Sequence, residues 1–115
     1  MALKLGGHLF TGPFSIETTQ VRANQPPVVF AIIAKEGEAW SPAFRVIDIG
    51  FSEDQGLHFA EHPRRAKWGE AAGGETGLGI YLFYAPKSDY SLADRQRLAA
   101  ELTQKYDPPR GLVEG

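Results

Sequence analysis

Two histidines at positions 58 and 62 have a spacing that could do chemistry. On a helix, residues four apart share one face, and two imidazoles placed in this way could ligate a metal ion. The same spacing also fits structural roles: His62 could bond a carbonyl at a helix end, and His58 could be a partly exposed polar residue. Because the structural roles need no further ligand, we expect no metal site here.

A basic cluster follows the second histidine and is formed by Arg64, Arg65, Lys67 and Trp68. Cationic side chains can contact phosphates, and a tryptophan ring can stack on a nucleic-acid base. The alternative is a solvated helix end whose tryptophan packs into the core. These four residues are therefore candidate binding residues, and nothing in their types points to catalysis.

Composition and charge weigh against strong nucleic-acid binding. The 115-residue chain has a net charge of −2, whereas proteins that neutralise phosphates usually show a basic excess or a basic face. There is no cysteine, which excludes disulfides and thiolate metal sites. The longest apolar run, Val28 to Ala34, is too short to span a bilayer, and the N-terminus lacks a signal-peptide core. We expect no membrane partner and a cytoplasmic location.

The apolar pattern predicts three strands that follow an irregular arm. Residues 1–26 contain Gly6-Gly7, Gly12-Pro13 and Pro26-Pro27, so we expect little regular structure there beyond one short strand near Gly7–Phe10. The strands expected after the arm are Val28–Lys35, Phe44–Ile49 and Leu78–Ala85. The first of them is continuously apolar, which indicates burial on both of its faces.

Two helices and a glycine-rich loop complete the expected elements. Ser52 and Gln55 have the spacing of a capping box, which predicts a first helix from Ser52 to the region of Pro63. Arg64–Trp68 is expected to add one more turn, and Gly69–Gly79 to be loop. A second helix is predicted from a capping box at Ser91 to Tyr106, ahead of Pro108-Pro109.

The resulting order is ββαβα, which predicts an α+β domain with a small, mainly antiparallel three-stranded sheet flanked by helices. Residues 1–26 would be an N-terminal arm that packs on the domain. Residues 27–110 would form the domain itself, and residues 111–115 a tail.

The order of several short motifs resembles the GIY-YIG nuclease family. Pro27–Ile32 is similar to the family's GIY strand, and Val46–Gly50 is similar to its YIG strand. Other residues fall where the family has common landmarks: Ser52, Phe59, His62, Trp68 and Tyr106–Pro109. The resemblance covers roughly residues 10–110 and depends on the ordered set, since short apolar strands are common.

The resemblance also implies which groups would perform nuclease chemistry. In the family, two tyrosines orient water, an arginine supports the phosphate charge and a glutamate binds a divalent metal. Position by position, these groups correspond to Phe30, Asp48, His58 and Ala99. A phenyl ring cannot transfer a proton, and alanine cannot ligate a metal. A shift of two residues would bring in Glu101 instead, which lies about 200° around the helix from Ala99.

We therefore expect a non-catalytic GIY-YIG-like binding module with a degenerate nuclease site, no cofactor, and nucleic acid or protein as its ligand. The resemblance places Asp48 and His58 at one cleft, which adds them to the candidate binding residues. One alternative is a divergent DNA endonuclease that uses Asp48, His58 and Glu101 with Mg²⁺ or Mn²⁺. Another is a hydrolase of small substrates at the Asp48/His58 pair. The sequence leaves open whether the cleft is empty or plugged by side chains.

Overall fold

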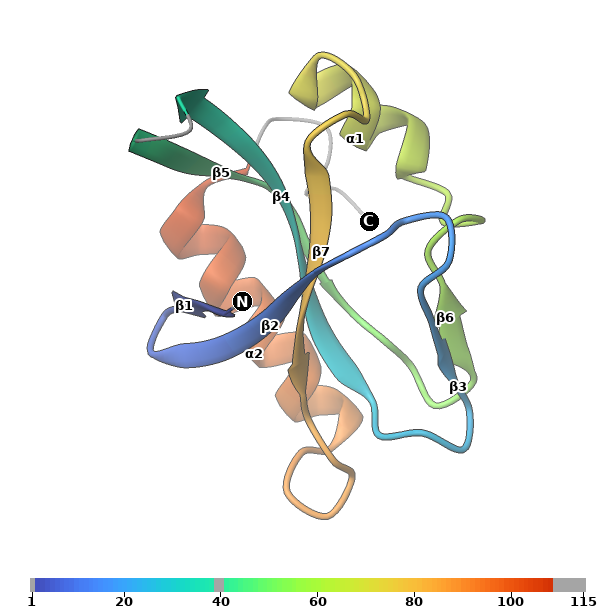
Figure 1. The fold of residues 1–115 in the computed structure, drawn as a ribbon. Coiled ribbons are helices and arrows are strands. Elements are labelled where there is room, and N and C mark those ends of the chain that lie inside the picture. Colours follow the sequence, from blue (N-terminus) through green and yellow to red (C-terminus); the bar gives the residue numbers. More distant parts are fainter. Residues whose placement is uncertain (1, 39–40, 109–115) are drawn as a thin grey trace.

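The computed structural model describes residues 2–38 and 41–108 and has an α+β fold (Figure 1). The main sheet is antiparallel and has five strands in the order β1-β2-β7-β4-β5, and β3 and β6 form a small second sheet. The strands are β1 (Ala2–Leu5), β2 (His8–Phe14), β3 (Gln20–Arg22), β4 (Val28–Glu38), β5 (Ser41–Phe51), β6 (Gly56–His58) and β7 (Leu78–Tyr84). The helices are α1 (Arg65–Ala72) and α2 (Leu92–Tyr106).

The main sheet separates two hydrophobic cores. On one face, α2 packs Leu98 and Leu102 against Phe10 and against odd-numbered residues of β4. On the other face, α1 and the small sheet cover the even-numbered residues of β4. Every residue from Val28 to Ala34 is buried, so the prediction of a strand buried on both faces is confirmed.

The first 26 residues are not the irregular arm that the sequence predicts. β1 and β2 form a hairpin whose turn is Gly6-Gly7, with φ of 56° and 84° at the two glycines. Positive φ at both positions of a two-residue turn matches the twist of a hairpin and favours glycine. Leu5 and Phe10 are buried, and β2 joins the main sheet through β7. These glycines form the turn between β1 and β2. The two strands add to the three that the sequence predicts, so the main sheet has five strands.

No helix starts at Ser52, so that prediction is wrong. The Ser52 hydroxyl accepts a hydrogen bond from the Val28 N–H at 2.9 Å, and the Ser52 N–H donates to the Val28 carbonyl. The chain then turns at Gly56, where φ is +90° and an added Cβ would lie 2.2 Å from the Val21 carbonyl oxygen. Residues 56–58 therefore pair with β3. Ser52 forms hydrogen bonds with Val28 at the start of β4 and does not cap a helix.

The first helix lies later in the chain, where the sequence predicts one turn and a loop. Trp68 is its buried residue and packs into the core beneath α1. Gly73 has a left-handed conformation, and its N–H donates to the Glu70 carbonyl, while the Gly74 N–H donates to the Gly69 carbonyl. The glycines that predict a loop thus form the C-terminal cap of the helix.

The prediction for α2 is confirmed. Its Ser91–Asp94 capping box has both hydrogen bonds, and the helix continues to Tyr106. The predicted tail at 111–115 lies outside the described residues. No helix in the described ranges is long and apolar enough to cross a membrane.

A buried arginine at the start of α2 generates a stability prediction. Arg95 is 1% exposed, and its Nη2 donates to Asp54 Oδ1 at 3.1 Å. Its Nε and Nη1 are buried without a hydrogen-bond partner. Asp54 therefore supplies the carboxylate that offsets the desolvation of this guanidinium.

We expect Asp54→Ala to lower the free energy of unfolding by about 2 kcal/mol, because it leaves a buried charge unpaired. The measurement is urea denaturation followed by circular dichroism. Glu53→Ala, a change at the exposed neighbouring carboxylate, is the control and should cost less than about 0.5 kcal/mol. Equal effects of the two variants would show that the Asp54 contact does not stabilise Arg95.

Candidate functional site

An open cleft of about 840 Å³ lies at the β5 edge of the main sheet. The loop before α1 forms one wall, α2 forms the other, and the end of β5 lies between them. The lining residues are Phe30, Ile49, Gly50, Phe51, His62, Pro63, Arg64, Gln96, Ala99, Ala100, Thr103, Gln104 and Asp107. These side chains leave the cleft open.

A β-bulge in β5 positions the carboxylate behind this cleft. Ile32 pairs with Asp48, but Ile33 pairs with Val46, so Ile47 is an extra residue in β5. Bulges change the direction of side chains and are common near functional sites. Here Ile47 and Asp48 both face the α1 side of the sheet in succession, which a regularly alternating strand could not achieve.

Asp48 is 1% exposed and is held by three donors. Its Oδ2 accepts from Trp68 Nε1 at 2.8 Å and pairs with Arg64 Nε at 3.1 Å, while its Oδ1 accepts from the Ile49 N–H at 2.9 Å. Burial raises the pKa of Asp48, and the three contacts oppose that rise. Asp48 does not line the cleft but orients Arg64, which does.

His62 is a neutral hydrogen-bonding group in the wall of the cleft. Its ring stacks on Trp68 with centroids 4.7 Å apart and meets the edge of Phe30 at 5.9 Å. Burial, together with the nearby Arg64 charge, lowers the pKa of His62 to about 4. Nδ1 accepts the Arg64 N–H at 3.1 Å, so the proton of the neutral ring is on Nε2, which can donate to a ligand.

Two of the residues assigned through the family resemblance line the cleft, Phe30 from β4 and Ala99 from α2. Phe30 lies so close to Gly50 that an added Cβ there would be 2.5 Å from its ring. Ala99 faces the cleft from α2. Glu101 instead lines a separate hollow with Asp94 and Arg97, on a different side of the same helix. Of these two residues of α2, Ala99 lines the β5 cleft and Glu101 does not.

The structure does not bring His58 to this site. His58 is exposed on β6 and pairs in register with Gln20. The prediction that His58 and His62 share one face of a helix is therefore wrong. Within the described ranges, no hydrogen bond or ion pair joins His58 to Asp48. The carboxylate has Arg64 and Trp68 as its side-chain partners instead.

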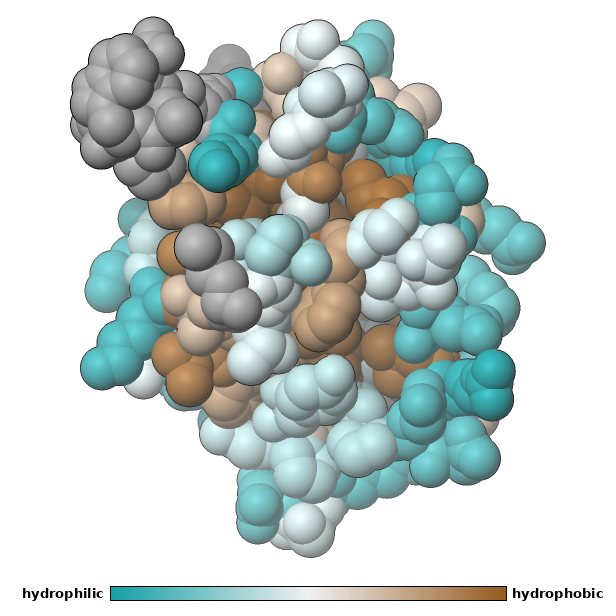
Figure 2. Space-filling view, in the orientation of Figure 1, coloured by the Kyte–Doolittle hydropathy of each residue, from teal (hydrophilic) through white to brown (hydrophobic). Residues whose placement is uncertain are grey.

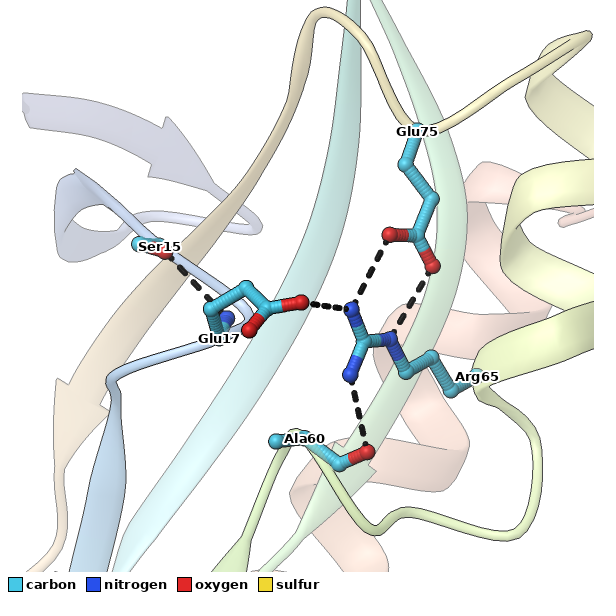
Figure 3. Close-up of polar contacts among 5 residues, drawn as sticks. All are labelled: Ser15, Glu17, Ala60, Arg65 and Glu75. Atoms are coloured by element: carbon cyan, nitrogen blue, oxygen red, sulfur yellow. Dashed lines mark hydrogen bonds and ion pairs between the residues drawn. The ribbon is translucent and has the colours of Figure 1, made fainter.

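Arg65 has a structural role despite its place in the basic cluster (Figure 3). Its Nη2 donates to Glu17 Oε1 at 2.7 Å, and its Nε donates to Glu75 Oε2 at 3.0 Å. Its Nη1 donates to the Ala60 carbonyl at 3.0 Å. The two carboxylates raise the pKa of Arg65. This guanidinium ties together the chain before β3, the loop before α1 and the loop after it.

The other members of the basic cluster also separate. Trp68 is fully buried, so its ring cannot stack on a nucleic-acid base. Lys67 is exposed on α1 and is not among the residues that line the cleft. Arg64 is the one member that lies in the cleft wall. The cluster is therefore not a continuous binding patch.

Apart from Ala99, sequence reasoning missed the residues of α2 and its C-terminal cap that line the cleft. The residues involved repeat with helical spacing, and they are Gln96, Ala100, Thr103, Gln104 and Asp107. A face of small and amide side chains on an otherwise charged helix was the available signal. Which of its faces a helix turns toward a sheet edge depends on tertiary packing, so the signal alone could not place them.

No group of three or more histidine, cysteine, aspartate or glutamate side chains in the described ranges is arranged to hold a metal ion. Comparisons with protein-family models, with curated proteins and with solved structures found no match to this chain.

We expect Trp68→Phe to lower the free energy of unfolding by about 1–3 kcal/mol, because the buried Asp48 carboxylate loses a donor. Thermal and urea denaturation would measure the loss. In an Asp48→Ala background the same change should cost at least about 1 kcal/mol less, since the acceptor is already absent. Additive effects would mean that the Trp68–Asp48 contact contributes no net stability.

The lowered pKa of His62 predicts a pH-dependent stability. Between about 4 and the ordinary 6.5 the unfolded chain binds more protons at this ring than the folded one, so stability increases with pH in this window. The contribution is fully present above about pH 6.5 and decreases as pH falls toward 4, by about 1–2 kcal/mol after allowance for partial exposure.

Urea denaturation at about pH 7.5 and about pH 5 would test this prediction. His62→Asn keeps an acceptor for the Arg64 N–H but does not titrate, so it should lose less stability at low pH than the wild type. His58→Asn, at an exposed position, should behave as the wild type does. The same pH dependence in all three proteins would contradict the assignment.

Proposed function

We propose that this chain is a GIY-YIG-like binding module with a degenerate nuclease site, and that it holds its ligand in the β5 cleft without cleaving it. One observation carries the proposal: Phe30 and Ala99 line the cleft where the resemblance requires a tyrosine and a metal-binding glutamate. Neither side chain can supply that chemistry. Loss of a single essential group typically lowers a rate by orders of magnitude.

The order of elements supports the same proposal. From Val28 onward the chain runs β4, β5, β6, α1, β7 and α2, which is ββαβα with one short additional strand. In this proposal β7, β4 and β5 correspond to the three-stranded sheet of the family. The β1–β2 hairpin and the small sheet would then be additions to that arrangement.

The lining of the cleft favours a protein ligand over a nucleic acid. Among the described lining residues, Arg64 is the permanent cation, and Asp107 contributes an opposite charge. Nucleic-acid affinity usually depends on several phosphate contacts from cationic side chains. An apolar floor beside the His62 Nε2–H suits a peptide segment that carries an apolar side chain next to a hydrogen-bond acceptor.

The endonuclease alternative receives less support from the geometry. Asp48 is buried behind Arg64, His58 is on β6 and Glu101 lines a different hollow. A metal-dependent reaction would need these three groups around one ion. The small-substrate alternative has the same difficulty, because it requires Asp48 and His58 to act together.

The first test of the proposal is a cleavage assay. Labelled single-stranded, duplex and branched DNA would be incubated with the protein and Mg²⁺, Mn²⁺ or a chelator, then separated on denaturing gels. We expect no cleavage in any condition, since the cleft lacks a metal-binding carboxylate at Ala99. Metal-dependent cleavage that Glu101→Ala abolishes would overturn the proposal in favour of the endonuclease.

Binding is tested with substitutions on the exposed face of α2. Ala100→Trp fills the cleft, whereas Ala93→Trp places the same ring on α2 outside it. A protein ligand recovered by affinity capture should bind Ala93→Trp normally and Ala100→Trp at least tenfold more weakly (about 1.4 kcal/mol). A ligand held equally by both variants would show that the cleft is not the binding site.

A nucleic-acid ligand would give a different result on native gels. Gln104→Glu adds a negative charge to the cleft with little change in shape, and Gln55→Glu is the matched control on an exposed turn. A salt-sensitive mobility shift that is weakened only by Gln104→Glu would identify nucleic acid as the ligand.

A further inference from the structure

A second hollow, of about 400 Å³, lies away from the β5 cleft and shares none of its described lining residues. It occupies the face of the main sheet to which Ile33 and Tyr81 belong, and no described α2 residue lines it. Its lining residues are Pro13, Ile33, Lys35, Phe44, Gly77, Leu78, Gly79 and Tyr81. Hydrophobic surface gathers between the β4–β5 hairpin and the upper end of β7, where these strands meet (Figures 1 and 2).

Close contact between β2 and β7 fixes the floor of this hollow. A Cβ added at Gly79 would lie 2.6 Å from the Pro13 Cβ, so only glycine allows the two strands to approach in this way. A Cβ added at Gly12 would lie 3.0 Å from the Tyr81 ring. The ring is therefore held against the backbone of β2 and has little freedom to turn its hydroxyl elsewhere.

Tyr81 lines the hollow, and its hydroxyl has no hydrogen-bond partner in the described part of the chain. The residue is 3% exposed, and buried tyrosine hydroxyls usually find a hydrogen-bond partner. The buried side-chain polar atoms that are sealed from solvent without a partner, among the described residues, are both on Arg95. The Tyr81 oxygen is thus not sealed from solvent, and the residue lines the hollow. Burial raises the pKa of Tyr81, so the hydroxyl is a donor at neutral pH.

Lys35 provides a positive charge at the rim. Its side chain is exposed and lines the hollow, and it has no ion pair with any described residue. Its backbone N–H donates to the Gly77 carbonyl at 3.1 Å, which fixes the start of the side chain beside β7. A hydroxyl donor and an ammonium at one apolar hollow are complementary to a negatively charged acceptor.

We propose that this hollow binds a small apolar carboxylate. Its aromatic or aliphatic body packs against Ile33 and Phe44, and its carboxylate accepts the Tyr81 O–H and pairs with the Lys35 ammonium. The volume lies at the lower end of the range for small-molecule sites, which is about 300–1,000 Å³. This site goes beyond the proposed function, because it is separate from the β5 cleft.

The test is a titration of the full chain with 2-naphthoate, followed by ¹H–¹⁵N NMR. We expect saturable shifts of the amides of Gly77–Tyr81 and binding at least about tenfold weaker for the neutral 2-naphthamide. Tyr81→Phe removes only the unpartnered hydroxyl and should weaken 2-naphthoate binding by about five- to tenfold. Lys35→Met should weaken it to a similar extent.

Matched controls are available on neighbouring strands. Tyr84→Phe changes an exposed tyrosine of β7, and Lys4→Met changes an exposed lysine of β1, and neither residue lines the hollow. Both variants should bind 2-naphthoate as the wild type does. Absence of saturable binding, equal binding of the amide, or an unchanged affinity in Tyr81→Phe would each overturn the proposal. None of these results would bear on the β5 cleft, whose lining residues are different.

Discussion

The buried carboxylate of Asp48 is the constraint on which the rest of the candidate site depends. A desolvated charge costs several kcal/mol unless donors surround it, and two of its three donors are side chains from the start of α1. Moving α1 away from β5 would leave the charge unpaired. The contacts of Arg64 and Trp68 therefore fix one wall of the cleft against the sheet edge, and His62 is held in place by its stack on Trp68.

Adjacent arginines in this chain have different roles. Arg64 pairs with a buried carboxylate and lies in the cleft, whereas Arg65 pairs with Glu17 and Glu75 and holds three surface segments together. A run of basic residues in a sequence is thus not the same as a basic surface. Arg95 is a third arginine with a structural role, because it is buried in the first turns of α2. In all three cases the guanidinium pairs with a carboxylate of the same chain. The chain has a slight excess of acidic residues over basic ones.

The elements that could be predicted from the sequence are those specified by local pattern. β4 and α2 are examples, because a continuous apolar run and a capping box each carry their own signal. The elements that could not be predicted depend on distant partners. Ser52 bonds to Val28, 24 residues away, and α1 is stabilised by a tryptophan whose acceptor lies in β5. At the site, Phe30 and Ala99 both line the cleft, but the position of His58 depends on the pairing of its strand with β3.

The bulge in β5 also bears on how this chain can be related to others. Over this stretch β5 is one residue longer than its partner, and the extra residue falls inside the segment that resembles the YIG motif. A comparison with a regular strand would have to open a one-residue gap between Val46 and Asp48. Without the gap, Phe44 and Val46 would be matched to residues on the opposite face of the sheet. Any alignment of this segment with another chain therefore depends on strand length as well as on residue identity.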